Sequence, residues 1–309
     1  MSTNQITHLN KQPFIPLLYG KAVLNSIIKT ATNTWSTRPF TQQYSVSGQS
    51  IDSTNLQRYI QCCRYSNTDH VPVTYPFVMA FPLLMKLMTS AQFPISILGL
   101  IHYKNAITQH SPINKSAIVT IICRVSNDIK ADKGRFIETH IDIFVDGQLM
   151  WECTSTFLQK SRRKQTKRHS EDSEDYENKP SPNNLFDSPT METISALKFN
   201  HFDALKYAYI SKDSNPIHLH YIPAKLMGFK STIMHGMLAK ARVLAQLETF
   251  IDIQHISIDV QFKSAIFLPA QVCLNVAVSP QNNTFSLTNA NNRVTHLSGV
   301  ISPLLNKTN

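Results

Sequence analysis

The sequence lacks the paired cysteines that a disulfide framework or a structural zinc site would need. Its cysteines are odd in number and none forms a C-x-x-C pair; they are Cys62, Cys63, Cys123, Cys153 and Cys273. Neither a disulfide-rich secreted domain nor a zinc finger is therefore indicated. The pattern favours reduced thiols in a cytoplasmic protein.

A long uninterrupted hydrophobic run is also missing. The best candidate, residues 75–88, is broken by Pro76, Pro82 and Lys86, and a membrane-spanning helix needs ~18 or more apolar residues. The N-terminus has no charged start followed by an apolar stretch and a small-residue cleavage site. We therefore expect a cytoplasmic protein without a membrane span.

Charged residues are few, at 16%, but they are unbalanced and give a formal net charge of +10. Such a charge would suit nucleic acid, a membrane surface or a phosphorylated cofactor. The densest basic cluster, residues 160–168, is followed at once by an acidic one at residues 171–177, so locally the two nearly cancel. Because no nucleic-acid-binding motif accompanies them, we expect no nucleic-acid partner.

The chain of 309 residues is 42% hydrophobic, which is enough to bury a core. Its length suits one large domain or two modest ones. The composition changes over residues 160–190, where charge blocks give way to "NKPSPNNLFDSPT", and we interpret this segment as a flexible linker. It separates residues 1–159 from residues 191–309.

The two halves resemble each other. "YPFVMA" (75–80) and "MHGMLA" (234–239) lie as far apart in the chain as "IHYKNAI" (101–107) and "VQFKSAI" (260–266) do, and this shared repeat offset suggests duplication. In the second half, apolar residues recur at helical spacing from Gly236 to about Phe250. Strand-like runs follow in both halves, with a hairpin signal at Val145-Asp146-Gly147 in the first. The sequence therefore predicts an α+β fold in which a sheet wraps a central helix, twice.

The stretch "DSNPIH" (213–218) places an acid and an imidazole five positions apart. Asn215 followed by Pro216 is typical of a helix start, with Asn as the N-cap. Asp213 would then lie on the incoming loop and His218 on the first turn, so their side chains could converge on a bound water. Taken alone, the six residues equally fit an ordinary turn that contains a histidine.

The wider segment resembles the MaoC-like (R)-specific enoyl-CoA hydratases and dehydratases. The positions that match the family pattern are Tyr209, Ser211, Asp213, Asn215, Pro216, Ile217, His218, Ala224, Ile233 and Gly236. The resemblance is dense over about residues 200–275 and weak in the first half. It implies a double hot-dog fold, in which residues 191–309 are the catalytic half and residues 1–159 a degenerate one. The repeat offset places Thr54 and Tyr59 opposite Asp213 and His218, so no catalytic pair is expected in the first half.

The resemblance implies a lyase that interconverts trans-2-enoyl and (R)-3-hydroxyacyl thioesters in fatty-acid metabolism. Asp213 and His218 would hold the water and act as acid and base, in an order that the sequence leaves open. The N–H of Gly236 would bind the thioester oxygen. Supporting contacts are expected from Ser211, Asn215, His235 and Lys230, the last with the phosphates of coenzyme A or a phosphopantetheine arm.

The substrate would arrive on coenzyme A or on an acyl carrier protein, and no metal or redox cofactor is expected. The protein would be a monomer of two hot-dog halves or a homodimer. One departure from the family pattern is Lys212, which stands where the family has glycine; a position that needs φ > 0 would be strained by ~1–2 kcal/mol. Two alternatives therefore stay open, a noncatalytic acyl-thioester-binding or interaction protein and a hot-dog thioesterase.

Overall fold

The computed structural model describes residues 6–32, 42–66, 69–97, 99–160, 191–279 and 281–304. The elements of the first half are β1 (Ile6–Leu9), α1 (Ile15–Thr32), β2 (Gln43–Ser50), α2 (Ser53–Cys63), α3 (Tyr75–Met88), β3 (Ile101–Gln109), β4 (Ile118–Ala131), β5 (Gly134–Val145) and β6 (Gln148–Lys160). Apart from Lys160, the predicted linker lies outside the described residues.

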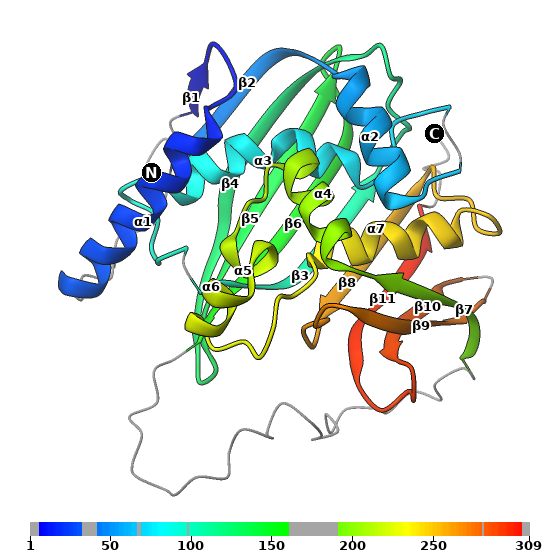
Figure 1. Ribbon diagram of the computed structural model, residues 1–309. Helices are drawn as coiled ribbons and strands as arrows, with labels where there is room; N and C mark the ends of the chain where they lie inside the picture. Colours follow the sequence, from blue (N-terminus) through cyan, green and yellow to red (C-terminus); the bar gives the residue numbers. More distant parts are fainter. Residues whose placement is uncertain are drawn as a thin grey trace, which may run out of the picture.

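The second half has the same plan with two additional short helices. Its elements are β7 (Glu192–Phe199), α4 (His201–Ser211), α5 (Pro216–Leu219), α6 (Tyr221–Leu226), α7 (Gly236–Leu247), β8 (Ile256–Phe262), β9 (Ala270–Ala277), β10 (Asn283–Asn289) and β11 (Thr295–Pro303). In Figure 1, α3 and α7 lie against the sheets of their respective halves. Among the described residues, no helix has the length and apolar character required to span a membrane.

All strands belong to one sheet, in the order β1-β2-β4-β5-β6-β3-β8-β11-β10-β9-β7. The order β2-β4-β5-β6-β3 in the first half repeats as β7-β9-β10-β11-β8 in the second, so each half is an antiparallel sheet wrapped around one helix. This confirms the predicted double hot-dog fold. The halves are joined through β3 and β8, which pair from Lys104↔Gln261 to Gln109↔Ile256.

The two central helices are the cores of the halves. Along α7, Leu238, Leu244 and Leu247 are fully buried, and burial of each leucine side chain contributes roughly 1.5–3 kcal/mol. The helix ends at Leu247, short of the predicted end, and Phe250 is half exposed. The residues that are buried against the sheet are therefore helical, whereas the exposed last turn of the predicted helix is not part of α7.

The predicted hairpin between β5 and β6 is confirmed. Asp146 and Gly147 form the two-residue connection, and both have positive φ, at 49° and 79°. This is the backbone conformation that matches the right-handed twist of the flanking strands, and glycine adopts it without cost.

The single repeat offset is wrong for the segment before each central helix. Asn200, the N-cap of α4, follows Asp52, the N-cap of α2, by a certain number of residues. The left-handed C-cap Lys212 follows its counterpart Arg64 by the same number, which is smaller than the repeat offset. The difference arises because α5 and α6 lengthen the connection from α4 to α7.

Thr54 and Tyr59, expected opposite the catalytic pair, therefore lie inside α2 instead. Alignment of α2 with α4 by their caps places Tyr65 opposite Asp213 and His70 opposite His218. The hydroxyl of Tyr65 is buried and lies 2.9 Å from the Thr74 hydroxyl. The first half therefore has a phenol where the second has a carboxylate, and its degeneracy stays a prediction.

Candidate active site

The loop that carries Asp213 is shaped by the end of α4. The helix begins with a capping box between Asn200 and Asp203 and ends at Lys212, whose φ is +63°. Beside it, the Ser211 hydroxyl donates to the Tyr207 carbonyl at 2.7 Å and accepts from the Asp213 N–H at 3.2 Å. Lys212 thus adopts the left-handed conformation for which the family uses glycine. The backbone path of the loop is therefore the one that glycine would allow, and the cost of the lysine is local backbone strain.

His218 is positioned by the short helix that follows. The Asn215 side chain accepts the Ile217 N–H at 3.4 Å, and Pro216 occupies the first helical position, as predicted for a helix start. Nδ1 of His218 lies 2.9 Å from the Ile233 carbonyl oxygen. Since a carbonyl only accepts, Nδ1 carries the proton, and Nε2 of the neutral ring has a free lone pair. Burial lowers the pKa of His218, against an opposing effect of the Asp213 charge, which keeps the ring neutral near pH 7.

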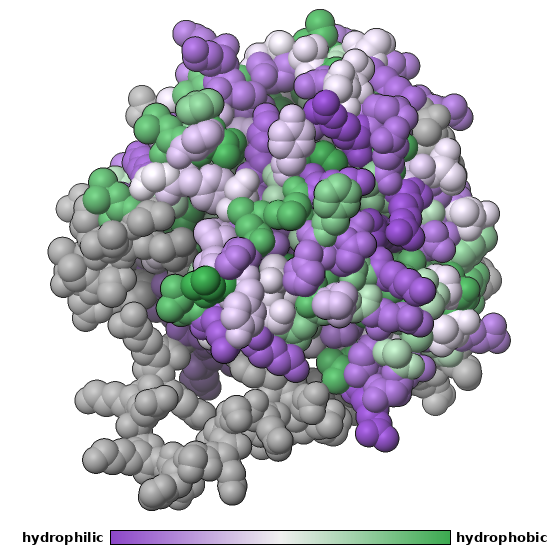
Figure 2. Space-filling model, in the orientation of Figure 1, coloured by the Kyte–Doolittle hydropathy of each residue, from purple (hydrophilic) through white to green (hydrophobic). Residues whose placement is uncertain are grey.

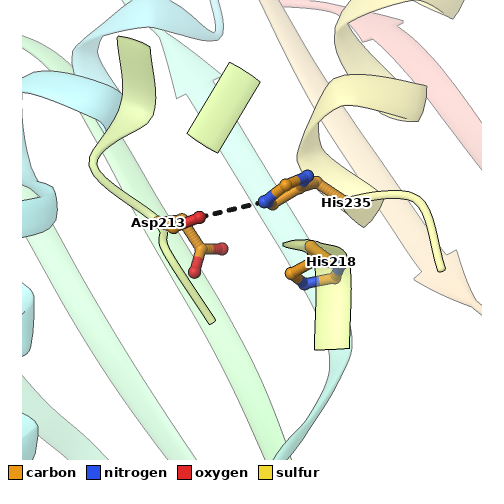
Figure 3. Close-up of side chains that lie close together, drawn as sticks. All are labelled: Asp213, His218 and His235. Carbon is orange, nitrogen blue, oxygen red and sulfur yellow. Dashed lines mark hydrogen bonds between the residues drawn. The ribbon is translucent and has the colours of Figure 1, made fainter. Parts of the chain in front are cut away.

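His235 connects the two groups (Figure 3). It is the N-cap residue of α7, and its ring stacks on His218 with centroids 3.8 Å apart. Its Nε2 donates to the Asp213 carbonyl oxygen at 3.0 Å. Burial, and then the neighbouring His218, hold the pKa of His235 well below its usual range. A neutral His235 therefore fixes the ring plane of His218 and the backbone of Asp213.

The carboxylate of Asp213 points toward the space beside the His218 ring (Figure 3). One oxygen of Asp213, one ring nitrogen of His218 and one of His235 all lie within 4.8 Å of one another. That separation accommodates one small molecule such as water, with the carboxylate as acceptor and the imidazole as proton acceptor or donor. The same distances would suit a metal ion, which proton transfer between these groups does not require.

Tyr19 is a residue of this site that the sequence analysis missed. It reaches the loop from α1, where its hydroxyl accepts the Ser214 N–H at 2.7 Å and lies 3.4 Å from Oδ1 of Asp213 and 3.3 Å from the Lys212 carbonyl oxygen. Burial, and then the Asp213 charge, raise the pKa of Tyr19. The phenol therefore stays protonated and ties the loop to the first half. No local pattern marks Tyr19, since its partners lie in the other half of the chain.

Gly236 begins α7, next to His235. Its N–H is among those at a helix start that have no partner within the helix, where the positive end of the helix dipole also lies. A Cβ at this position would come within 2.9 Å of the Phe262 ring. The glycine therefore permits close packing against Phe262, which would have to shift for any larger residue, whatever the role of Gly236 toward substrate.

Lys230 is exposed, and its ammonium lies 4.7 Å from the ring centroid of Phe267. Its expected contact with a phosphate stays a prediction. On the face of the molecule that carries α4, α5 and α6, hydrophobic side chains lie in separate groups among hydrophilic ones (Figure 2). Exposed large hydrophobic residues of α4 include Phe202 and Leu205.

Comparison with known proteins shows the family of this chain. Residues 186–299 match the family model described as "MaoC like domain". The chain is 31% identical over 289 residues to 3-hydroxyacyl-thioester dehydratase X of Mycobacterium tuberculosis, covering 91% of this chain and 98% of that protein. It belongs to the MaoC-like dehydratase family.

Solved structures of the family share the whole architecture. The crystal structure of HtdX of Mycobacterium tuberculosis superposes with a TM-score of 0.72 and 27% identity, over 85% of this chain and 100% of that one. A MaoC-like dehydratase from Phytophthora capsici superposes with a TM-score of 0.65 at 16% identity, over 85% of this chain and 95% of that one, and supports the fold alone. This MaoC-like dehydratase is thus a lyase with two hot-dog halves.

Proposed function

We propose that the protein catalyses the reversible addition of water to trans-2-enoyl thioesters, which gives (R)-3-hydroxyacyl thioesters, in fatty-acid metabolism. The observation that carries this proposal is the pairing of the Asp213 carboxylate with a neutral His218 whose Nδ1 is fixed by the Ile233 carbonyl. The relative from Mycobacterium tuberculosis, a 3-hydroxyacyl-thioester dehydratase by name, supports the substrate class.

In the hydration direction, the water oxygen forms a bond to C3 of the enoyl thioester and one water proton is transferred to C2. His218 Nε2 has the free lone pair that takes this proton and then gives it to C2. Asp213 orients the water by accepting a hydrogen bond from its other O–H, which stays on the oxygen and becomes the 3-hydroxyl group. The Gly236 N–H stabilises the negative charge that develops on the thioester oxygen by donating a hydrogen bond to it. The chain supplies every group for these steps, so we propose that the reaction needs no metal or redox cofactor.

The substrate brings its own carrier, coenzyme A or the phosphopantetheine arm of an acyl carrier protein. We propose a cytoplasmic location, and the five free thiols, four of them buried, support it. A monomer suffices for the proposed site, since both halves needed to build it, including Tyr19 from the first, lie in one chain.

The experiment follows two signals in one reaction, with crotonyl-CoA and a longer trans-2-enoyl-CoA. Hydration is expected to remove the absorbance of the conjugated enoyl thioester without release of free thiol, and chiral analysis should find the (R)-3-hydroxyacyl product. Release of thiol would instead establish a thioesterase. If neither signal changes, with carrier-linked substrates also inert and the protein folded, the noncatalytic binding alternative replaces the proposal.

A further inference from the structure

A second cluster of histidines and carboxylates lies in the first half, on the face of the sheet opposite to α3. Along β5, Ile141 and Ile143 are fully buried against the core. Because successive side chains of a strand point to opposite faces, His140 and Asp142 lie on the outer face. Neither belongs to the site around Asp213.

Two carboxylates of this cluster are direct cross-strand neighbours. Asp142 on β5 is paired in register with Glu152 on β6. Like charges directly opposite each other destabilise an antiparallel pair. The two side chains nevertheless lie together with His140, with one ligand atom of each within 4.8 Å of the others. The arrangement therefore depends on positive charge beside the carboxylates, part of which Arg124 supplies to Asp142.

Two imidazoles face these carboxylates. His140 Nε2 lies 2.8 Å from Oδ1 of Asp142 and 3.3 Å from Oε2 of Glu152. His110, which follows β3, has its Nε2 2.9 Å from Oε1 of Glu152. Its backbone N–H donates to the Met150 carbonyl at 2.9 Å, which holds His110 beside the strand that carries Glu152. One imidazole and two carboxylates therefore converge from β5 and β6, while His110 contacts the other oxygen of Glu152.

A further layer of contacts orients these ligands. Nδ1 of His140 lies 2.9 Å from the hydroxyl of Thr154, which leaves Nε2 toward the carboxylates. Arg124 binds the other oxygen of Asp142, which leaves Oδ1 toward His140. Metal-binding histidines commonly bond through their second nitrogen in this way, and ligating carboxylates are hydrogen-bonded in turn.

We propose that His140, Asp142 and Glu152 form a binding site for a divalent transition-metal ion of the zinc class, with a water as the fourth ligand. One imidazole, two monodentate carboxylates and a water satisfy the tetrahedral preference of zinc. Tetrahedral zinc ligands lie about 3.3 Å apart, so the contacts of 2.8 Å and 3.3 Å from His140 to Asp142 and Glu152 need only small adjustments. The ion would join β5 and β6 on the outer face, at a site remote from Asp213 and His218.

The alternative is a network in which Arg124 and the two imidazoles bind the carboxylates without a metal. The test is titration of the chelator-treated full-length protein with zinc chloride near pH 7.5, by calorimetry and by the cobalt(II) absorption spectrum. The variants are Glu152→Gln, which keeps the shape and removes a ligand charge, and Thr154→Val, which removes only the orienting hydroxyl. His218→Ala is the matched control from the other cluster.

One equivalent of zinc is expected in the natural protein and in His218→Ala. Zinc affinity should fall at least roughly 100-fold in Glu152→Gln and roughly 10–100-fold in Thr154→Val. Zinc should also raise the melting temperature of the natural protein and leave that of Glu152→Gln unchanged. Failure of the natural protein to bind zinc stoichiometrically, unaltered zinc binding in both strand variants, or loss of zinc in His218→Ala instead would overturn the proposal. Should Glu152→Gln not fold, His140→Gln replaces it, since it removes the imidazole ligand.

Discussion

Replacement of Lys212 by glycine should stabilise the protein. The residue has φ +63° at the end of α4, where a non-glycine side chain costs ~1–2 kcal/mol. Glycine relieves this cost but gives the unfolded chain about 0.5–1 kcal/mol of additional conformational entropy. The expected net gain in the free energy of unfolding is about 0.5–1 kcal/mol, which corresponds to roughly 1–4 °C in melting temperature for a chain of this size.

Two variants serve as controls in chemical and thermal unfolding. Lys212→Ala removes the charged side chain but keeps Cβ, so its stability should stay within about 0.5 kcal/mol of the natural protein. Arg64→Gly makes the same change at the equivalent end of α2, where φ is +66°, and should stabilise equally. Enzymatic activity should be unchanged in Lys212→Gly, because Lys212 already has the left-handed backbone conformation that glycine would adopt. An equal gain in Lys212→Ala, or a clear loss in Lys212→Gly, would refute the reasoning.

Three further predictions concern the site and the core. Gly236→Ala places a methyl group against Phe262 and should cost ~1–3 kcal/mol of stability and reduce kcat; if packing is the sole cause, Phe262→Leu in the same chain restores both. Tyr19→Phe removes a hydroxyl that binds the Asp213 loop and should lower kcat more than it raises KM, with a stability loss of about 1 kcal/mol; equal kinetics would make Tyr19 a packing residue. Lys240 is fully buried, and burial lowers its pKa from 10.5 to about 7. Unfolding therefore takes up a proton between these pH values, so stability should rise with pH across that window, and Lys240→Met should remove this contribution from the measured profile.

Much of the fold could be predicted because local pattern and tertiary structure agree. The helical periodicity after Gly236, the turn at Asp146 and Gly147, and the Asn215-Pro216 helix start are local signals, and the structure has each element where its signal lies. The repeat offset was right for the central helices and wrong ahead of them, because an ungapped comparison cannot register the insertion of α5 and α6.

The site could be predicted only where its residues lie close together in the sequence. Asp213 and His218 come together as their spacing indicated, while the stacking of His235 on His218 depends on α7 packing beside α5. Tyr19 and the buried Lys240, which donates to Asn105 of the other half, act through contacts between halves. Such contacts leave no periodicity or motif in a single sequence.

The most direct test of the account compares initial hydration rates of the natural protein, Asp213→Asn and His218→Ala, with crotonyl-CoA and a longer trans-2-enoyl-CoA. His220→Ala is the matched control, since His220 lies two residues from His218 but is exposed and only caps α6. The account predicts a loss of ~100-fold or more in kcat for the first two variants and little change in the control. Full activity in Asp213→Asn or His218→Ala, with the natural protein active, would contradict the assignment of this pair as the proton-transfer groups.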